Sequence, residues 1–418
     1  MTTGDGDYYR LRTEWLRFKS HLQDGITGLP ALPAVLEEVR RMLEAHGGVD
    51  LVYLDLGRSG WHETKLGWAA YDEAIRSFAK RLLGMRGGDL AADDVLCLHT
   101  VRSDRFLIFR GVKAGLAEGS GALRGRLLQA LGPGPSALPH APRIATGHAQ
   151  VRTDPMTRSE RAIQQAVADA MMMSLREREG IESARRADLQ RLIAESRVRS
   201  VFHPIVRIAD ASVVGHEALT RPIGAHAFDS VEELFAFAES TDLLGAFERL
   251  CRSTAIRAAA KLPGRSLLFL NASARAVEDP EWSSGAVDTL LAENGMSPKD
   301  VVVEITERLA VTHIDTFSAV LRSFKERGYR VAVDDMGAGY ASLQSLASIE
   351  PEFLKFDVSL VRDIDKSSIK RGLLESLRSL ADKIRARVIA EGIEREEERV
   401  TLLSLGVELG QGFLFHKE

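Results

Sequence analysis

A repeated pattern in the second half of the chain constrains its fold more than any other feature. Short apolar segments rich in strand-forming residues end in a polar residue and are followed by segments with the apolar spacing of a helix. The polar residues at these ends are Glu217, Asn271, Glu304, Asp334, Lys355, Glu391 and Gln411. Because (β/α) barrels carry their chemistry at the carboxyl ends of their strands, the pattern predicts an α/β barrel with these side chains at one rim.

The segment VAVDDMGAGY, residues 331–340, stands at the centre of this pattern. Its apolar run ends in the adjacent carboxylates Asp334 and Asp335, and the glycines that follow indicate a loop. Carboxylate and amide oxygens are the hard ligands that Mg²⁺ and Mn²⁺ prefer. Two such ions can activate a water and neutralise charge on an attacked phosphate. The sequence therefore predicts a two-metal site suited to phosphodiester hydrolysis.

Each of these polar residues also has a simpler interpretation. A lone carboxylate at a strand end is often a helix cap or a surface charge, Asn271 could cap a following helix, and Lys355 could form an exposed ion pair. If there were no common site, every one of these simpler interpretations would have to be correct at the same time. The joint occurrence of the residues therefore favours a common site.

Composition excludes several classes of function. A formal net charge of -4 leaves no basic excess for a nucleic-acid backbone, so we expect neither DNA nor RNA as a partner. The two cysteines, Cys97 and Cys251, form no CxxC pair, which argues against a zinc site or a disulfide framework. No apolar run has the length of a membrane span and no signal sequence stands at the N-terminus. We therefore expect a cytoplasmic protein.

Three regions follow from the order of the predicted elements. Residues 1–155 read as a separate α/β domain with a short N-terminal helix. Residues 156–197 are rich in Ala, Arg, Glu and Gln and predict a helical connector interrupted at Gly180. This connector could transmit a signal, or it could be only the last helix of the first domain with a linker. Residues 198–418 carry the barrel pattern.

From about Ser200 onwards the chain resembles the EAL-domain cyclic-di-GMP phosphodiesterases. Segments HPIV, GHEALTR, LNAS, VEITE, VDDMGAGYASL, LKFD, AEGIE and LGQGF follow that family's order and spacing. The resemblance implies a TIM-like (β/α) barrel that hydrolyses cyclic di-GMP to linear pGpG with two Mg²⁺ or Mn²⁺ ions. It also implies a homodimer.

The resemblance assigns roles to individual residues. The metal ligands would be Glu217, Asn271, Glu304, Asp334, Asp335 and Glu391. Lys355 would orient or polarise the attacking water, and the catalytic set would be Lys355, Glu217, Asp335 and Glu391. The substrate-binding residues would be Arg221, Leu219, Asp357 and Gln411, and Glu307 would anchor the loop after Asp335. His203, Met336 and Ala338 depart from the family pattern without removing a ligand.

The first region resembles a GGDEF diguanylate cyclase domain with an altered signature. DGITGLP and LVYLDL match, and Asp55 stands where a metal-binding aspartate is expected. The hairpin that should read GGDEF instead has the residues Arg102, Ser103, Asp104, Arg105 and Phe106. The two glycines would let the backbone approach GTP, so Arg102 and Ser103 should block that approach. The product-inhibition motif RxxD is also missing, with Asp93 and Leu96 at its two ends.

We therefore expect a catalytically inactive GGDEF-like domain that regulates or dimerises the chain. Residual GTP binding stays open because Asp55 and Asp104 are retained. Two functions of the barrel remain open as well, a cyclic-di-GMP phosphodiesterase and a non-enzymatic cyclic-di-GMP receptor that signals to a protein partner. The complete ligand set favours the enzyme, and the hairpin disfavours a bifunctional cyclase and phosphodiesterase.

Overall fold

The computed structural model describes residues 15, 18, 22–57, 68–112, 120–131, 144–264, 266–273, 279–306, 321–336 and 349–417. The chain divides into two compact units, Met1–Arg186 and Ala187–Glu418. Most of the predicted N-terminal helix, Glu307 and Ala338 lie outside the described residues. The boundaries of a separate connector at residues 156–197 stay a prediction. None of the described helices combines the length and the apolar composition that crossing a bilayer requires.

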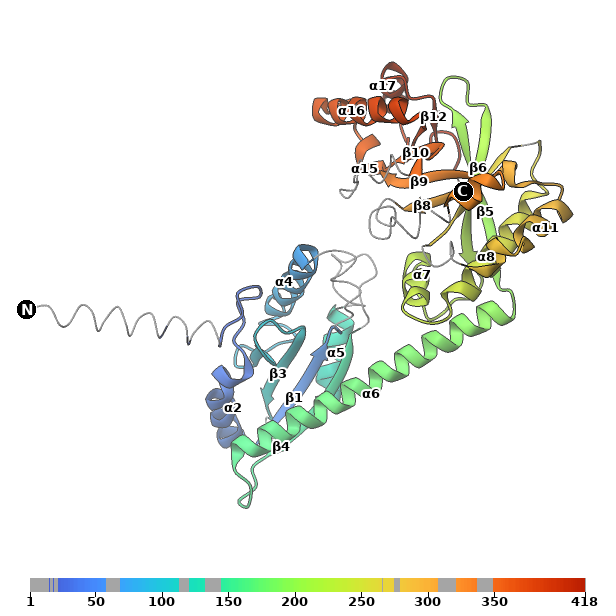
Figure 1. Cartoon of the computed structure of the whole chain (residues 1–418). Helices are drawn as coiled ribbons and strands as arrows, with labels where there is room; N and C mark the ends of the chain where they lie inside the picture. Colours follow the sequence, from blue (N-terminus) through green and yellow to red (C-terminus); the bar gives the residue numbers. More distant parts are fainter. Residues whose placement is uncertain are drawn as a thin grey trace, which may run out of the picture. The chain divides into compact units, whose positions relative to one another are not determined.

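The first unit is built on a four-stranded sheet in the order β2-β3-β1-β4. Figure 1 labels β1, β3 and β4 of this sheet. Its strands are β1 Gly48–Asp55, β2 Val95–Leu98, β3 Arg105–Gly111 and β4 Ala145–Arg152. Strand β1 is antiparallel to both β3 and β4 and is buried along its whole length. Its apolar sequence therefore serves both faces of the sheet, as expected for a central strand.

Helices cover both faces of this sheet. Residues of α2 (Leu32–His46) and of the first turns of α6 (Ser159–Ala194) pack on one face, where Val39, Leu43 and Ile163 are fully buried. Residues of α4 (Trp68–Gly84) and α5 (Ser120–Leu131) pack on the other face, around Phe78 and Leu127. The unit is thus an α/β domain, as the sequence predicts.

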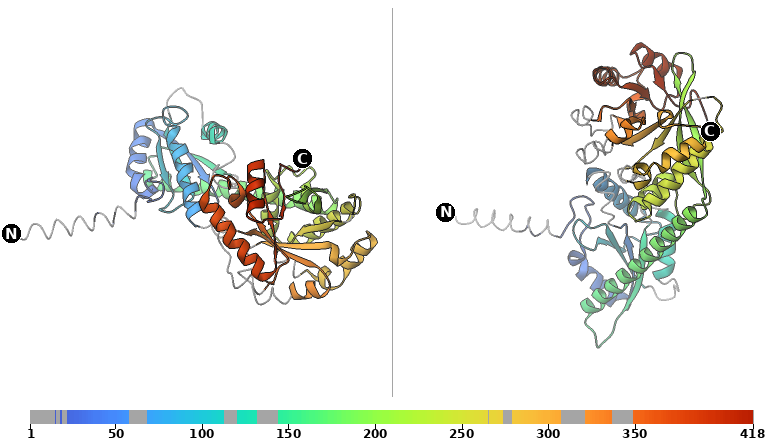
Figure 2. Two further views of the ribbon diagram at one scale, coloured as in Figure 1. Left: turned by 90° about the horizontal axis from the view of Figure 1, so that it is seen from above. Right: turned by 45° about the vertical axis from the view of Figure 1, so that its right-hand side comes forward.

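Helix α6 contains 36 residues and continues through Gly180, where a break was predicted (Figures 1 and 2). A single glycine weakens a helix by only about 1 kcal/mol, and the flanking residues favour the helix. A glycine is required instead at Gly147 of β4, because an added Cβ would lie 1.7 Å from the carbonyl oxygen of Ala170 on α6. The helix therefore packs directly against the backbone of the sheet.

The second unit is a closed eight-stranded barrel in the order β10-β11-β12-β5-β6-β7-β8-β9. Its strands are β5 Val198–Arg207, β6 Val213–Pro222, β7 Leu267–Asn271, β8 Val301–Thr306, β9 Arg330–Met336, β10 Phe353–Phe356, β11 Arg387–Ala390 and β12 Leu409–Gly410. The described helices of this unit are α7 Val231–Glu239, α8 Leu244–Ala259, α10 Pro280–Ser283, α11 Ala286–Glu293, α15 Val358–Val361, α16 Ser368–Ile384 and α17 Glu396–Ser404. The predicted α/β barrel is confirmed.

One strand departs from the regular strand-helix repeat. Strand β5 runs antiparallel to both of its neighbours, β6 and β12, whereas the remaining neighbours are parallel. Only residues 208–212 join β5 to β6, and a parallel crossover needs about a dozen residues or more. The short connection therefore forces a hairpin, with Ala211 at φ 57° in its turn.

Replacing Gly147 by alanine should destabilise the first unit by roughly 3 kcal/mol, because the new methyl group would displace α6 from the sheet. Urea unfolding of the full chain followed by circular dichroism would measure this loss. Gly180→Ala is the matched control, since nothing lies within 4 Å of an added Cβ there. It should stabilise the helix by about 0.5–1 kcal/mol. Equal effects of the two variants would contradict the packing described.

Candidate active site

The predicted polar side chains meet at the carboxyl ends of the barrel strands. Glu217, Asn271, Glu304, Asp334 and Lys355 lie on β6, β7, β8, β9 and β10. Glu391 and Gln411 follow directly after β11 and β12. An apolar layer lies two residues earlier in each strand, and it includes Phe269, Val302, Ala332, Phe353, Ile389 and Leu409. Because side chains two apart share a face of a strand, this layer supports the polar side chains from below.

The ammonium group of Lys355 forms the centre of the site. Its Nζ atom lies 2.8 Å from Glu391 Oε1 and 2.9 Å from Glu304 Oε1. It also lies 3.3 Å from both Glu217 Oε2 and Asp334 Oδ2. The side chain is completely buried. Four carboxylates from four different strands thus share one buried cation.

Two amide side chains complete this network. Gln411 Nε2 donates hydrogen bonds to Glu217 Oε2 at 2.8 Å and to Glu391 Oε1 at 2.9 Å. Asn271 Nδ2 donates to Glu217 Oε1 at 3.3 Å. These bonds orient the carboxylates and leave the amide oxygen of Asn271 available as a ligand.

Burial and shared charge shift the pKa values of the cluster in different directions. Burial raises the pKa of Glu304 well above its usual value and that of Glu391 to about 8, although Lys355 opposes both shifts. Burial also acts to raise the pKa of Glu217, but Lys355 and the two amides hold it below its usual value. The four carboxylates keep the pKa of Lys355 well above normal despite its burial. The site is therefore short of positive charge.

The acidic groups fit a divalent cation. Glu217, Glu304 and Asp334 each offer a carboxylate oxygen within 4.8 Å of the others, and so do Asp334, Asp335 and Glu391. Of the two carboxylate oxygens of the buried Glu304, Oε1 contacts the Lys355 ammonium group, whereas Oε2 has no hydrogen-bond partner among the described residues. Such buried acceptors are costly unless a cation or a proton approaches them. A site with hard oxygen donors and too little positive charge suits Mg²⁺ or Mn²⁺.

Asp335 differs from the other acids of the cluster. It is exposed, and its φ of 59° lies in the left-handed region that few residues other than glycine adopt. Its backbone N–H donates to Asp334 Oδ1 at 2.9 Å, which stabilises this conformation. The unusual backbone thus keeps the two adjacent carboxylates on the same side of the site despite the alternation of a strand.

The other predicted residues lie outside the ion pairs of Lys355. Arg221 and Leu219 are half-buried on β6, and Asp357 caps the short helix α15 by accepting a hydrogen bond from the Ser359 N–H at 2.8 Å. His203 lies opposite Glu217 in the register of β5 and β6 and packs edge-on against His416. Glu307 lies outside the described residues.

Sequence reasoning missed Glu248 on α8. This buried glutamate accepts hydrogen bonds from the N–H and the hydroxyl of Ser273, two residues after Asn271. Burial raises its pKa to about 6. A signal was present, because Glu248 falls on the apolar face of the helix next to the buried Leu244 and Phe247. A carboxylate at such a position requires a partner.

The altered hairpin of the first unit and the nearby Asp55 bear on whether this unit can bind GTP. Arg102, at the first signature position, has a φ of 56°, a conformation that favours glycine. The buried carboxylate of Asp55 lies 3.3 Å from Arg178 Nη2 and 3.7 Å from Arg105 Nε. Two guanidinium groups thus compensate the charge of Asp55, which leaves little attraction for a metal ion.

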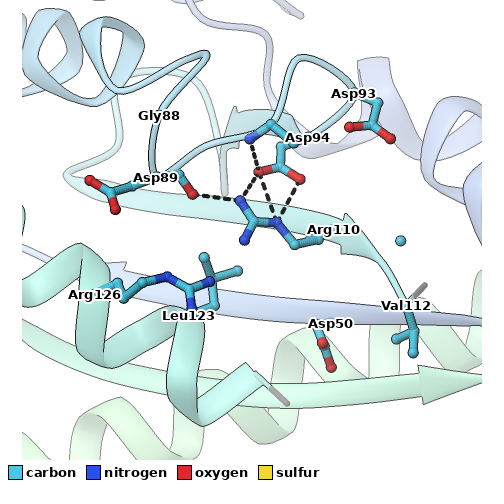
Figure 3. A pocket seen from close by; sticks show the side chains of 11 residues that line it. Asp50, Gly88, Asp89, Asp93, Asp94, Arg110, Val112, Leu123 and Arg126 are labelled. Atoms are coloured by element: carbon cyan, nitrogen blue, oxygen red, sulfur yellow. Dashed lines mark hydrogen bonds and ion pairs between the residues drawn. The ribbon is translucent and has the colours of Figure 1, made fainter. Parts of the chain in front are cut away.

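A cavity of about 410 Å³ lies in the same unit, near the position of the missing RxxD motif (Figure 3). Asp50, Asp89, Asp93 and Asp94 are among its lining residues, together with Arg110 and Arg126. Arg110 is held in place, because its Nε donates to both oxygens of Asp94 and its Nη2 donates to the carbonyl of Asp89. Carboxylates outnumber guanidinium groups here, so the cavity does not suit an anionic dinucleotide.

Comparisons with known proteins agree with this geometry. A family model described as EAL domain matches residues 186–418. An uncharacterized protein of Mycobacterium tuberculosis (strain ATCC 25618 / H37Rv) is 28% identical over 422 residues, covering 94% of this chain and 66% of that protein. The chain therefore spans slightly less than two thirds of the length of this relative.

Two further matches cover smaller parts of the chain. The cyclic di-GMP phosphodiesterase PdeF of Escherichia coli (strain K12) is 35% identical over 131 residues, which cover 31% of this chain and 18% of that protein. The solved PaMucR phosphodiesterase in complex with c-di-GMP has a TM-score of 0.51 at 23% identity and covers 55% of this chain and 95% of that structure. The second likeness concerns the fold alone.

Replacing Lys355 by methionine should destabilise the second unit by about 3–5 kcal/mol without metal, because four carboxylates would lose their buried counter-charge. Thermal and urea unfolding of chelator-treated protein would measure the loss. Lys366→Met is the matched control, since Lys366 pairs with Asp363 at the surface, and it should cost less than about 1 kcal/mol. A similar small loss in both variants would show that Lys355 does not hold the cluster together.

Proposed function

The chain belongs to the EAL domain family, and we propose that it is a metal-dependent phosphodiesterase that hydrolyses cyclic di-GMP to linear pGpG. The observation that carries the proposal is the buried cluster in which Glu217, Glu304, Asp334 and Glu391 surround Lys355. The substrate class is supported by the relatives, since PdeF is a cyclic di-GMP phosphodiesterase and PaMucR was solved in complex with c-di-GMP.

The proposed metal ligands are Glu217, Asn271, Glu304, Asp334, Asp335 and Glu391. Their donors are all hard oxygens, which favours Mg²⁺ or Mn²⁺ over softer metals. When bound, two such ions would supply a deprotonated water and neutralise the charge that builds up on the phosphate oxygens. The acidic side chains alone would repel an anionic substrate.

Lys355 has a role that its protonation state defines. The surrounding carboxylates raise its pKa well above normal, so its ammonium group stays charged and can donate a hydrogen bond but cannot accept a proton. We propose that it orients or polarises the attacking water. Gln411 holds Glu217 and Glu391 in position through its two hydrogen bonds, and this preorganisation reduces rearrangement during the reaction.

Substrate recognition is proposed for residues around the cluster. Arg221 would pair with a phosphate of cyclic di-GMP, because a guanidinium group can bind two phosphate oxygens at once. Leu219, Asp357 and Gln411 would line the rest of the substrate site. Glu307 is proposed to anchor the loop after Asp335.

The first unit is proposed to be a GGDEF-like domain that regulates the barrel without synthesising cyclic di-GMP. Arg102 and Ser103 in the hairpin, and the two arginines beside Asp55, support the loss of GTP chemistry. A homodimer and a cytoplasmic location remain predictions. The alternative function, a receptor that binds cyclic di-GMP and signals to a protein partner, is disfavoured because all six proposed ligands are present.

Purified full-length chain should convert cyclic di-GMP to pGpG in the presence of Mg²⁺ or Mn²⁺, as measured by chromatography of the products. Glu217→Ala and chelator treatment should each lower turnover at least about 100-fold, because they remove the ions that supply the nucleophile. Glu396→Ala, on the exposed surface of α17, should retain activity. Tight binding of cyclic di-GMP without product would instead establish a receptor.

Titration of the full chain with GTP and Mg²⁺ should give no heat beyond dilution at micromolar concentrations. Arg105 and Arg178 compensate Asp55, and the hairpin backbone carries side chains where glycines would be needed. Isothermal titration calorimetry measures this outcome, with cyclic di-GMP and Ca²⁺ as the positive control on the same sample. Saturable heat with GTP would overturn the proposal that the first unit has lost its nucleotide site.

A further inference from the structure

Glu248 links helix α8 to the strand end that carries Asn271. Its Oε1 atom accepts a hydrogen bond from the Ser273 N–H at 3.2 Å, and its Oε2 atom accepts one from the Ser273 hydroxyl at 3.0 Å. The residue is 8% exposed, so water competes little for these bonds. One buried carboxylate therefore fixes both the backbone and the side chain of Ser273.

The backbone after β7 is held from a second direction as well. The Ala272 N–H donates to the carbonyl oxygen of Glu304, on the neighbouring strand β8, at 2.9 Å. Asn271 is thus followed by two residues whose N–H groups are both engaged, one by the neighbouring strand and one by Glu248. This clamp sets the direction in which Asn271 leaves the strand and donates to Glu217 at 3.3 Å.

No neighbouring cation forms an ion pair with Glu248 among the described residues. Arg252, one turn later on α8, is committed to Asp279 at 3.1 Å and to Glu281 at 2.8 Å, and it stacks on Trp282. No ion pair within 4.0 Å joins Glu248 to a cation among the described residues. Its hydrogen bonds to Ser273 therefore account for a buried carboxylate that is otherwise expensive to keep.

We propose that Glu248 is a positioning residue that presents the Asn271 side chain to the metal ion of the active site. Residues behind a metal ligand commonly change metal affinity by about 10- to 100-fold when they are removed. This inference rests on the proposed metal site and deepens it. It assigns no contact between Glu248 and the substrate or the ion.

The test is the affinity of the full chain for Mn²⁺ alone, measured by calorimetry and by electron paramagnetic resonance of free Mn²⁺. Glu248→Ala should weaken binding about 10-fold. Glu248→Gln should stay within about 2-fold of the parent, because an amide can accept from the Ser273 N–H and donate to its hydroxyl. Glu233→Ala is the matched control, since Glu233 is a buried glutamate that accepts from the Asp229 N–H in a different loop, and it should also stay within about 2-fold.

A double-mutant cycle separates positioning from general support of the fold. If Glu248 acts through Asn271, adding Glu248→Ala to Asn271→Ala should change the Mn²⁺ affinity no further. A second 10-fold loss in that background, or an unchanged affinity in Glu248→Ala itself, would overturn the proposal. If Glu248→Ala does not fold, Ser273→Ala removes one of the two bonds and should weaken binding about 3-fold. Failure of the parent chain to bind Mn²⁺ would instead overturn the proposed metal site.

Discussion

The buried ammonium group of Lys355 is the interaction on which the barrel rim depends. Four strands end in carboxylates that point to the same place, and their mutual repulsion would otherwise oppose closure of the barrel. Taking an unpaired carboxylate out of water costs several kcal/mol. One cation shared by all four reduces that cost and fixes their relative positions. It also leaves them short of positive charge, which is the property that a metal site needs.

The position of the cluster follows from the alternation of side chains along the strands. On every strand of the cluster except β6, the polar residue stands two positions after a member of the apolar layer, so the pairs Phe269 and Asn271, Val302 and Glu304, and Phe353 and Lys355 point the same way. On β6 the corresponding residue is Gly215, where an added Cβ would lie 2.6 Å from the ring of Phe269. The glycine makes room for that aromatic ring. The polar site is therefore placed by the packing of the apolar layer beneath it.

The strand ends could be predicted from the sequence because their signals are local. A run of apolar residues, a polar end and a following helix are all visible within about 20 residues. The antiparallel direction of β5 was not predicted, because the predicted pattern was a regular strand-helix repeat, whereas the short connection at residues 208–212 forces a hairpin. Contacts between residues far apart in the sequence left no local signal. For example, Arg178 donates a hydrogen bond to the backbone carbonyl of Asp55, which lies 123 positions earlier in the chain. Ser273 alone gives no indication that Glu248 lies behind it.

The burial of the acidic groups also indicates how a cation would reach them. Side-chain exposure rises from 0% for Glu304 to 8% for Glu217, 13% for Asp334 and 16% for Glu391, and Asp335 is exposed. Lys355 lies at the buried end of this series, so the charge that it does not compensate faces the open rim. Attraction for a cation is therefore strongest where solvent has access. A lysine at the exposed end would have occupied the entrance, whereas at the buried end it stabilises the apo site and leaves the entrance to the metal.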